Sequence, residues 1–125
     1  MLAHQRLRAW QSAHQLALQT FMVTQHWPKR ELYGLSAQTR RAALSVPTNI
    51  AEGAARFGRK DFARFLNIAL GSLAELHYLL EFARDLGICE TSDWDRLNRI
   101  RDQTGKLLWA LYRGVRPPTS DRPTV

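Results

Sequence analysis

Residues 33–53 read YGLSAQTRRAALSVPTNIAEG, and this stretch decides the fold. Its apolar side chains recur every three or four positions, which predicts an α-helix over about residues 36–55. Ser36 is the expected N-cap. Pro47 removes one backbone hydrogen bond inside the helix and should bend it there. The expected apolar face consists of Thr39, Ala42, Ala43, Val46, Ile50 and Ala54.

A line of polar residues runs beside that apolar face. Steps of three and four place its members on one side of the helix. They are Gln38, Arg41, Ser45, Asn49, Glu52 and Arg56. This line forms either the solvent-facing side of an amphipathic helix or a polar seam against another helix or another subunit. Ser45 and Asn49 are short and solubilise a surface poorly, which favours the seam.

The segment from about residue 60 to residue 86 predicts the longest helix, and Gly87 is its expected end. One apolar line is Ala69, Leu73, Leu76, Leu80 and Ala83. A second line, with the same heptad-like rhythm, is Phe65, Ile68, Ser72, Glu75, Leu79, Phe82 and Leu86. Two adjacent lines exceed what a small monomeric bundle needs to bury, which favours a homo-oligomer. A core thickened by aromatic residues of the other helices is the alternative.

Ser72 and Glu75 interrupt the second line. A carboxylate between Ile68 and Phe82 would be partly buried and would need a partner, unless it reaches solvent from the edge of the line. Arg40 or Arg41 suits this role, because a guanidinium can bind a carboxylate through two hydrogen bonds. The predicted polar seam is therefore Arg40, Arg41, Ser45, Asn49, Glu52, Ser72 and Glu75.

Two further helices flank this pair. Helical periodicity covers about residues 6–25, ended by Pro28, and the region from Thr91-Ser92-Asp93 to about Arg113, ended by Gly114. Helices with short connections predict an all-α fold, an antiparallel up-down-up-down four-helix bundle over residues 1–114. Residues 115–125 are rich in proline and are expected to form a disordered tail.

Composition restricts the classes of partner. Lys and Arg number 18 against 11 Asp and Glu, so the net charge is +7, which suits anionic partners such as RNA, DNA or an acidic protein face. The alternative is a solvated surface that happens to be basic. Cys89 is the single cysteine, which excludes an internal disulfide and suits a reducing compartment. The sequence contains neither a signal-like apolar core at its start nor a run long enough to span a bilayer. We therefore expect a cytoplasmic protein without membrane contact.

A cluster of cations lies where the second and third helices join. Its members are Arg56, Arg59, Lys60 and Arg64, with Asp61 as the only acidic residue among them. Such residues at a helix–helix turn can contact phosphates without reading bases. Phe57 and Phe62 beside them could stack on bases. The favoured interpretation, however, is that Phe62 belongs to the core and Phe57 anchors the loop.

Catalytic signatures are missing from the sequence. Bundle di-metal sites use Glu-x-x-His pairs, whereas Tyr78 follows Glu75 by three positions and Ala55 follows Glu52 by three. His14 and His77 suit packed or surface histidines better than metal ligands. No phosphate-binding glycine loop or nucleophile motif is present. The sequence predicts a non-catalytic protein without a metal or cofactor.

Several motifs occur together over roughly residues 7–111. They are Trp27-Pro28, Tyr33-Gly34-Leu35, Arg40-Arg41-Ala42-Ala43, Ser45-Val46-Pro47, Asn49-Ile50-Ala51-Glu52-Gly53, Ala69-x-Gly71-Ser72 and Glu75-Leu76. With them the chain resembles the four-helix-bundle proteins first noticed as reading frames in intervening sequences of bacterial 23S ribosomal RNA genes. It is also similar to the accessory variability determinant proteins of diversity-generating retroelements.

This resemblance implies a four-helix bundle that commonly forms a homopentamer with a central channel. The retroelement proteins bind a reverse transcriptase and nucleic acid through a basic surface, so the resemblance also implies those partners. Trp27 stands where the family often has Phe, and His77 stands where it often has a second acidic residue. We therefore expect a non-catalytic oligomer that binds RNA or DNA by charge. The alternative is a scaffold that docks a protein partner without nucleic acid.

Overall fold

The computed structural model describes residues 1–118, and its regular structure within that range is entirely helical. The α-helices are α1 (Arg8–Thr24), α2 (Leu35–Ala54), α3 (Arg59–Asp85) and α4 (Thr91–Val115). Two short 3-10 helices, η1 (Ala3–Arg6) and η2 (Lys29–Glu31), precede α1 and α2. The predicted all-α fold is confirmed.

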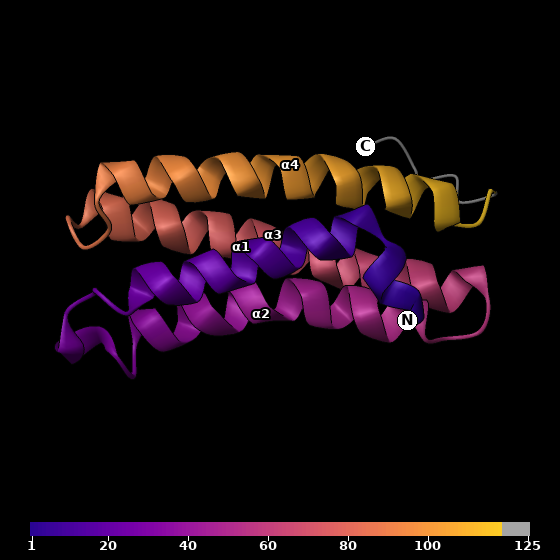
Figure 1. The fold of residues 1–125 in the computed structure, drawn as a ribbon, viewed down its shortest axis with the longest axis horizontal. Helices are drawn as coiled ribbons and strands as arrows, with labels where there is room; N and C mark the ends of the chain where they lie inside the picture. Colours follow the sequence, from indigo (N-terminus) through magenta and orange to yellow (C-terminus); the bar gives the residue numbers. More distant parts are fainter. Residues whose placement is uncertain (119–125) are drawn as a thin grey trace, which may run out of the picture.

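The four α-helices lie side by side, and each runs antiparallel to the next in the chain (Figure 1). α1 packs on α2 and α4, and α3 packs on the same two helices, whereas the diagonal pairs do not meet within residues 1–118. The predicted up-down-up-down four-helix bundle is therefore confirmed. One end of the bundle gathers the start of α1, the α2–α3 turn and the end of α4, and we call it the α2–α3 end.

The core lies along the bundle axis and contains the first apolar line predicted on α3, from Ala69 to Ala83, all of it buried. The second line divides in two. Phe65, Ser72 and Leu79 turn toward α2 or the core, whereas Ile68, Glu75 and Phe82 are exposed. The division arises because positions three residues apart on a helix differ by about 60° in direction, so the two sets of heptad-spaced residues face different surroundings.

Glycines shape both ends of α3. Gly58 precedes it with φ of 90°, and Gly87 follows it with φ of 77°. At Gly87 the Ile88 N–H donates to the Ala83 carbonyl at 2.8 Å, and the Gly87 N–H donates to the Arg84 carbonyl at 2.9 Å. This is the hydrogen-bond pattern of a Schellman motif, so Gly87 ends α3 as predicted.

Two predicted helix ends differ from the structure. Ser36 is not an N-cap, because α2 begins at Leu35 with Gly34 in the cap position, and Ser36 is buried in the first turn. Gly114 does not stop α4, which continues to Val115, the first residue of the predicted tail. The part of that tail at residues 119–125 lies outside the described residues. Over residues 1–118, the structure contains no helix with the length and apolar character needed to cross a membrane.

Candidate nucleic-acid interface

The predicted cation cluster lies at the α2–α3 end. Arg56, Arg59, Lys60 and Arg64 are all exposed there, around the turn that joins α2 and α3. Carboxylates oppose two of them: Glu52 lies 3.9 Å from Arg56, and Asp61 lies 3.2 Å from Arg64. Because these pairs are about half exposed, they bind the guanidinium groups only weakly.

Phe65 organises two of the cations. Its ring is buried near the start of α3, and the guanidinium carbons of Arg56 and Arg64 lie 5.0 Å and 4.6 Å from its centroid. Both distances suit cation–π attraction. The buried ring thus holds two guanidinium groups at the surface, which lowers the entropy that they would lose on binding an anion.

Arg59 and Lys60 differ in their contacts. Arg59 donates from Nη2 to the Gly114 carbonyl at 2.7 Å and from Nε to the Val115 carbonyl at 3.1 Å. It therefore ties the α2–α3 turn to the last turn of α4. Within residues 1–118, Lys60 forms neither an ion pair nor a side-chain hydrogen bond. Of these two predicted residues, Lys60 is the one whose charge is available to a ligand.

Other cations join the cluster in three dimensions. The described segments that meet at this end are residues 1–8, 52–64 and 109–118, and their carboxylates are Glu52 and Asp61. Their Arg and Lys residues are Arg6, Arg8, Arg56, Arg59, Lys60, Arg64, Arg113 and Arg116. The contribution of η1 and α4 is not evident from the sequence, since it comes from segments far apart in the chain. Only the predicted antiparallel topology, which places the start of α1 and the end of α4 beside the α2–α3 turn, could have indicated this contribution.

Phe57 stands at the tip of the α2–α3 turn. Its side chain is 100% exposed, so the interpretation of Phe57 as a loop anchor is wrong. Phe62, by contrast, is partly buried and packs against the core, as expected. A hollow of about 400 Å³ lies beside Phe57. It is lined by Phe57, Gly58, Arg59, Lys60, Asp61 and Arg64.

The structure brings three predicted seam residues together. Ser45 Oγ on α2 and Ser72 Oγ on α3 lie 2.8 Å apart and are hydrogen bonded. Asn49 donates from Nδ2 to the Ser45 carbonyl at 2.8 Å and to Ser45 Oγ at 2.9 Å. This small network connects α2 to α3 at a half-buried position.

The remaining seam residues point elsewhere. Arg40 turns toward α1, where its Nε donates to Thr24 Oγ1 at 2.8 Å. Glu75 is exposed, and neither Arg40 nor Arg41 forms an ion pair with it within residues 1–118. The expected buried pair is therefore absent from the single chain. Ile68 and Phe82, which were expected to enclose Glu75, are themselves 43% and 42% exposed.

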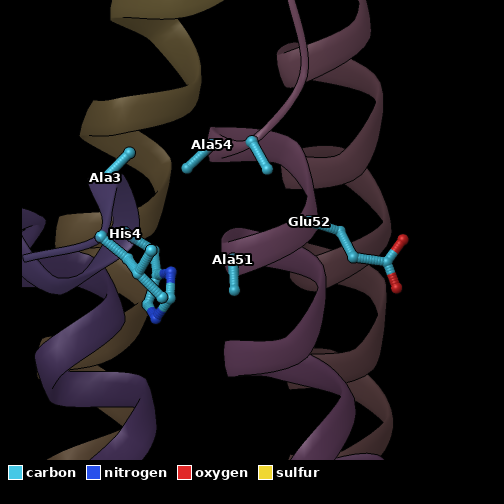
Figure 2. Close-up of a pocket in the computed structure, with 7 residues that line it drawn as sticks. Ala3, His4, Ala51, Glu52 and Ala54 are labelled. Atoms are coloured by element: carbon cyan, nitrogen blue, oxygen red, sulfur yellow. The ribbon is translucent and has the colours of Figure 1, made fainter.

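A second hollow, of about 590 Å³, separates η1 from the end of α2. Figure 2 shows Ala3 and His4 facing Ala51 and Ala54 across it, whereas the Glu52 carboxylate points away. Its lining is mostly apolar and places no carboxylate beside the histidine. No group of three or more potential metal ligands comes together in the part of the chain that the structure describes.

An apolar strip covers the outer side of α3. Tyr78 and Leu86 are 61% and 59% exposed, and Ile68 and Phe82 lie on the same side of the helix. Gly71 lies between them, together with the exposed carboxylate of Glu75. We call Ile68, Tyr78, Phe82 and Leu86 the α3 apolar face. It contains the exposed part of the surplus apolar surface predicted from the sequence.

Comparisons with known proteins agree with this fold. A family model described as 23S rRNA-intervening sequence protein matches residues 5–110. A crystal structure of a protein with unknown function from the S23 ribosomal protein family of Bacteroides thetaiotaomicron is similar, with a TM-score of 0.78 and 23% sequence identity. The match covers 84% of this chain and 95% of that one. No curated protein sequence matches the chain.

Proposed function

This chain belongs to the family of 23S rRNA-intervening sequence proteins, and we propose that it is a non-catalytic homo-oligomer that binds RNA or DNA through its α2–α3 end. The observation that carries nucleic-acid binding is the excess of cations over carboxylates at that end, gathered from three separate segments. Charge of one sign concentrated on one surface attracts a polyanion and supplies the sequence-independent part of nucleic-acid affinity.

The α3 apolar face supports self-association. Large apolar side chains in one strip along a helix lower the free energy when a second surface covers them. If the surface that covers them is a different face of an identical chain, repetition of the contact closes a ring when the rotation between copies closes, and extends a filament when it does not. We propose such a ring, with five copies as the family resemblance implies. Its mass in solution would be five times the chain mass of 14.4 kDa, which light scattering measures.

Salt-dependent binding tests the nucleic-acid part. The triple variant Arg56→Gln, Lys60→Gln and Arg64→Gln keeps the Arg59 contacts with α4 and removes the other predicted cations. Fluorescence anisotropy with labelled mixed-sequence RNA and DNA should show weaker binding. The slope of log affinity against log salt concentration should fall by about 0.7–0.9 for each phosphate that the variant no longer neutralises. Lys29→Gln removes one charge from an exposed lysine at the opposite end, so it is the matched control for Lys60→Gln alone, and it should bind as the wild type does.

A scaffold that docks a protein partner is the second candidate function. The α3 apolar face favours it, because that surface suits a protein partner as well as a second copy. The two candidates differ in the same assay. A chain with no affinity for RNA or DNA at low salt would contradict the nucleic-acid proposal and favour the scaffold.

A further inference from the structure

Phe57 occupies an unusual position for an aromatic side chain. It lies in the short turn between α2 and α3, and its ring contributes nothing to the core because it is 100% exposed. The neighbouring Gly58 has φ of 90°, a backbone conformation that other residues rarely adopt. Arg59 then fixes the far side of the turn by its two hydrogen bonds to the end of α4. The turn thus presents the ring to solvent from an anchored backbone.

The surroundings of the ring suit one class of ligand. Lys60 and Arg64 line the same hollow as Phe57, and its volume of about 400 Å³ falls within the usual range of about 300–1,000 Å³ for small-ligand sites. A flat apolar ring beside cations matches a nucleotide, whose base is flat and whose phosphate is an anion. An acidic peptide would satisfy the cations, but it offers a flat group only where it carries an aromatic residue, whereas every nucleotide carries a flat base.

We infer that Phe57 is a stacking platform for an unpaired base, so that the ligand of the α2–α3 end is single-stranded RNA or DNA. This inference rests on the proposed function and narrows its ligand class. In a duplex each base is already stacked between its neighbours, and its faces are closed to a protein ring. A single strand can turn a base onto Phe57 while its phosphates lie against Lys60 and Arg64.

Self-association would leave this surface open. The α3 apolar face runs along α3, whereas Phe57 lies in the α2–α3 turn, which Figure 1 shows at one end of the bundle. Contact through helix sides buries flanks and leaves the turns in solvent. In a ring, one Phe57 turn from each copy would lie at the same end, and a single strand could contact several of them in succession.

Four labelled probes of about 12 nucleotides test the inference, a length within the site sizes of single-strand binders. They are a mixed-sequence DNA strand, the RNA strand of the same sequence, the corresponding DNA duplex, and a DNA strand whose sugars carry no bases. Wild type is compared with Phe57→Ala and Phe57→Trp. Tyr33→Ala is the matched control, since it removes a 92% exposed ring at the opposite end. The RNA and DNA arms report which sugar the site prefers.

The expected result is selective. Phe57→Ala should weaken binding of either single strand by about 5- to 150-fold for each stacked base, with no change in the salt slope. Its affinity for the duplex and for the base-free strand should stay within about twofold, because neither can stack on the ring. Phe57→Trp and Tyr33→Ala should bind as the wild type does. Unchanged thermal unfolding of each variant would show that folding is intact.

Two results would overturn the inference, and they separate it from the proposed function. Phe57→Ala could bind single strands as tightly as wild type while the triple variant of Arg56, Lys60 and Arg64 binds them more weakly. That result would support binding by charge and contradict stacking on Phe57. If the wild-type protein binds none of the probes at low salt, both fail together.

Discussion

At the residue scale, Gly53 shows how a single atom limits the packing of α2 on α3. A Cβ at this position would lie 2.8 Å from Phe65 Cβ and 2.9 Å from Phe62 Cδ1. The sequence alone suggests only a weak point near the end of the helix, since glycine has a low helix propensity. The close contact depends on which residue of α3 lies opposite, and helical periodicity cannot supply that register.

We predict that Gly53→Ala destabilises the fold. Alanine should gain up to about 1 kcal/mol of helix propensity, but overpacking against a Cβ and a backbone carbonyl costs about 1–3 kcal/mol. The free energy of unfolding in urea should therefore fall by roughly 1–2 kcal/mol. Gly105→Ala in α4 is the control, because its Cβ would lie 3.5 Å from Leu73 Cδ2, an ordinary contact. A Gly53 variant as stable as the Gly105 variant would contradict the packing argument.

Cys89 gives a second residue-scale prediction. Burial, reinforced by Asp93 and Glu90, raises the pKa of its thiol from 9.0 to about 11. Below pH 9 the folded protein should therefore hold about a hundredfold less thiolate than the unfolded chain, and alkylation should be slower by at least that factor. The folded state binds the proton more tightly, so stability should fall as pH rises through the interval from 9 to 11. Iodoacetamide labelling followed by mass spectrometry measures the rate. Equal rates in native buffer and in urea would show that the thiol is not protected.

At the element scale, α3 shows what periodicity can and cannot resolve. Its helix and its buried line from Ala69 to Ala83 are predictable, because apolar residues at steps of three and four need only one core direction. The second line is harder to interpret, since Ser72 finds Ser45 across the α2 contact while Glu75, three residues later, faces solvent. Which of the two is buried depends on the angle at which α2 crosses α3, and that angle comes from tertiary packing.

Arg59 supports a prediction about α4. Its guanidinium satisfies the carbonyls of Gly114 and Val115 and places a positive charge at a helix C-terminus, where the helix dipole favours it. Arg59→Gln should therefore loosen the last turn of α4 and lower stability by about 0.3–1 kcal/mol. Hydrogen exchange should accelerate for the amides of residues 112–116, which include the Arg116 N–H donated to the Tyr112 carbonyl at 2.8 Å. Unchanged exchange in that turn would mean that the contact does not hold the helix end.

At the whole-molecule scale, the bundle converts separate sequence features into two surfaces. The fold was predictable, because four periodic segments with short connections leave few arrangements. The cation cluster at the α2–α3 turn was partly predictable, since Arg56, Arg59, Lys60 and Arg64 are close in sequence. Arg6, Arg8, Arg113 and Arg116 join it only because antiparallel topology returns the start of α1 and the end of α4 to that turn. The full exposure of Phe57 was not predictable, since its neighbours in sequence do not determine whether a turn folds back on the core.

The side of the bundle gives the last prediction, which concerns assembly. If copies associate through the α3 apolar face, two further carboxylates beside Glu75 would be desolvated at the contact without partners. Tyr78→Glu combined with Phe82→Glu should therefore reduce the mass measured by light scattering to that of one chain, 14.4 kDa. Helical circular dichroism should remain, because both side chains are exposed in the single chain.

Leu18→Glu combined with Met22→Glu, at exposed positions of α1, is the matched control and should keep the wild-type mass. Loss of assembly in the α1 variant but not in the α3 variant would move the contact to α1. A wild-type protein that is already monomeric at micromolar concentration would contradict the proposed ring. It would not contradict nucleic-acid binding, which one α2–α3 end could still provide.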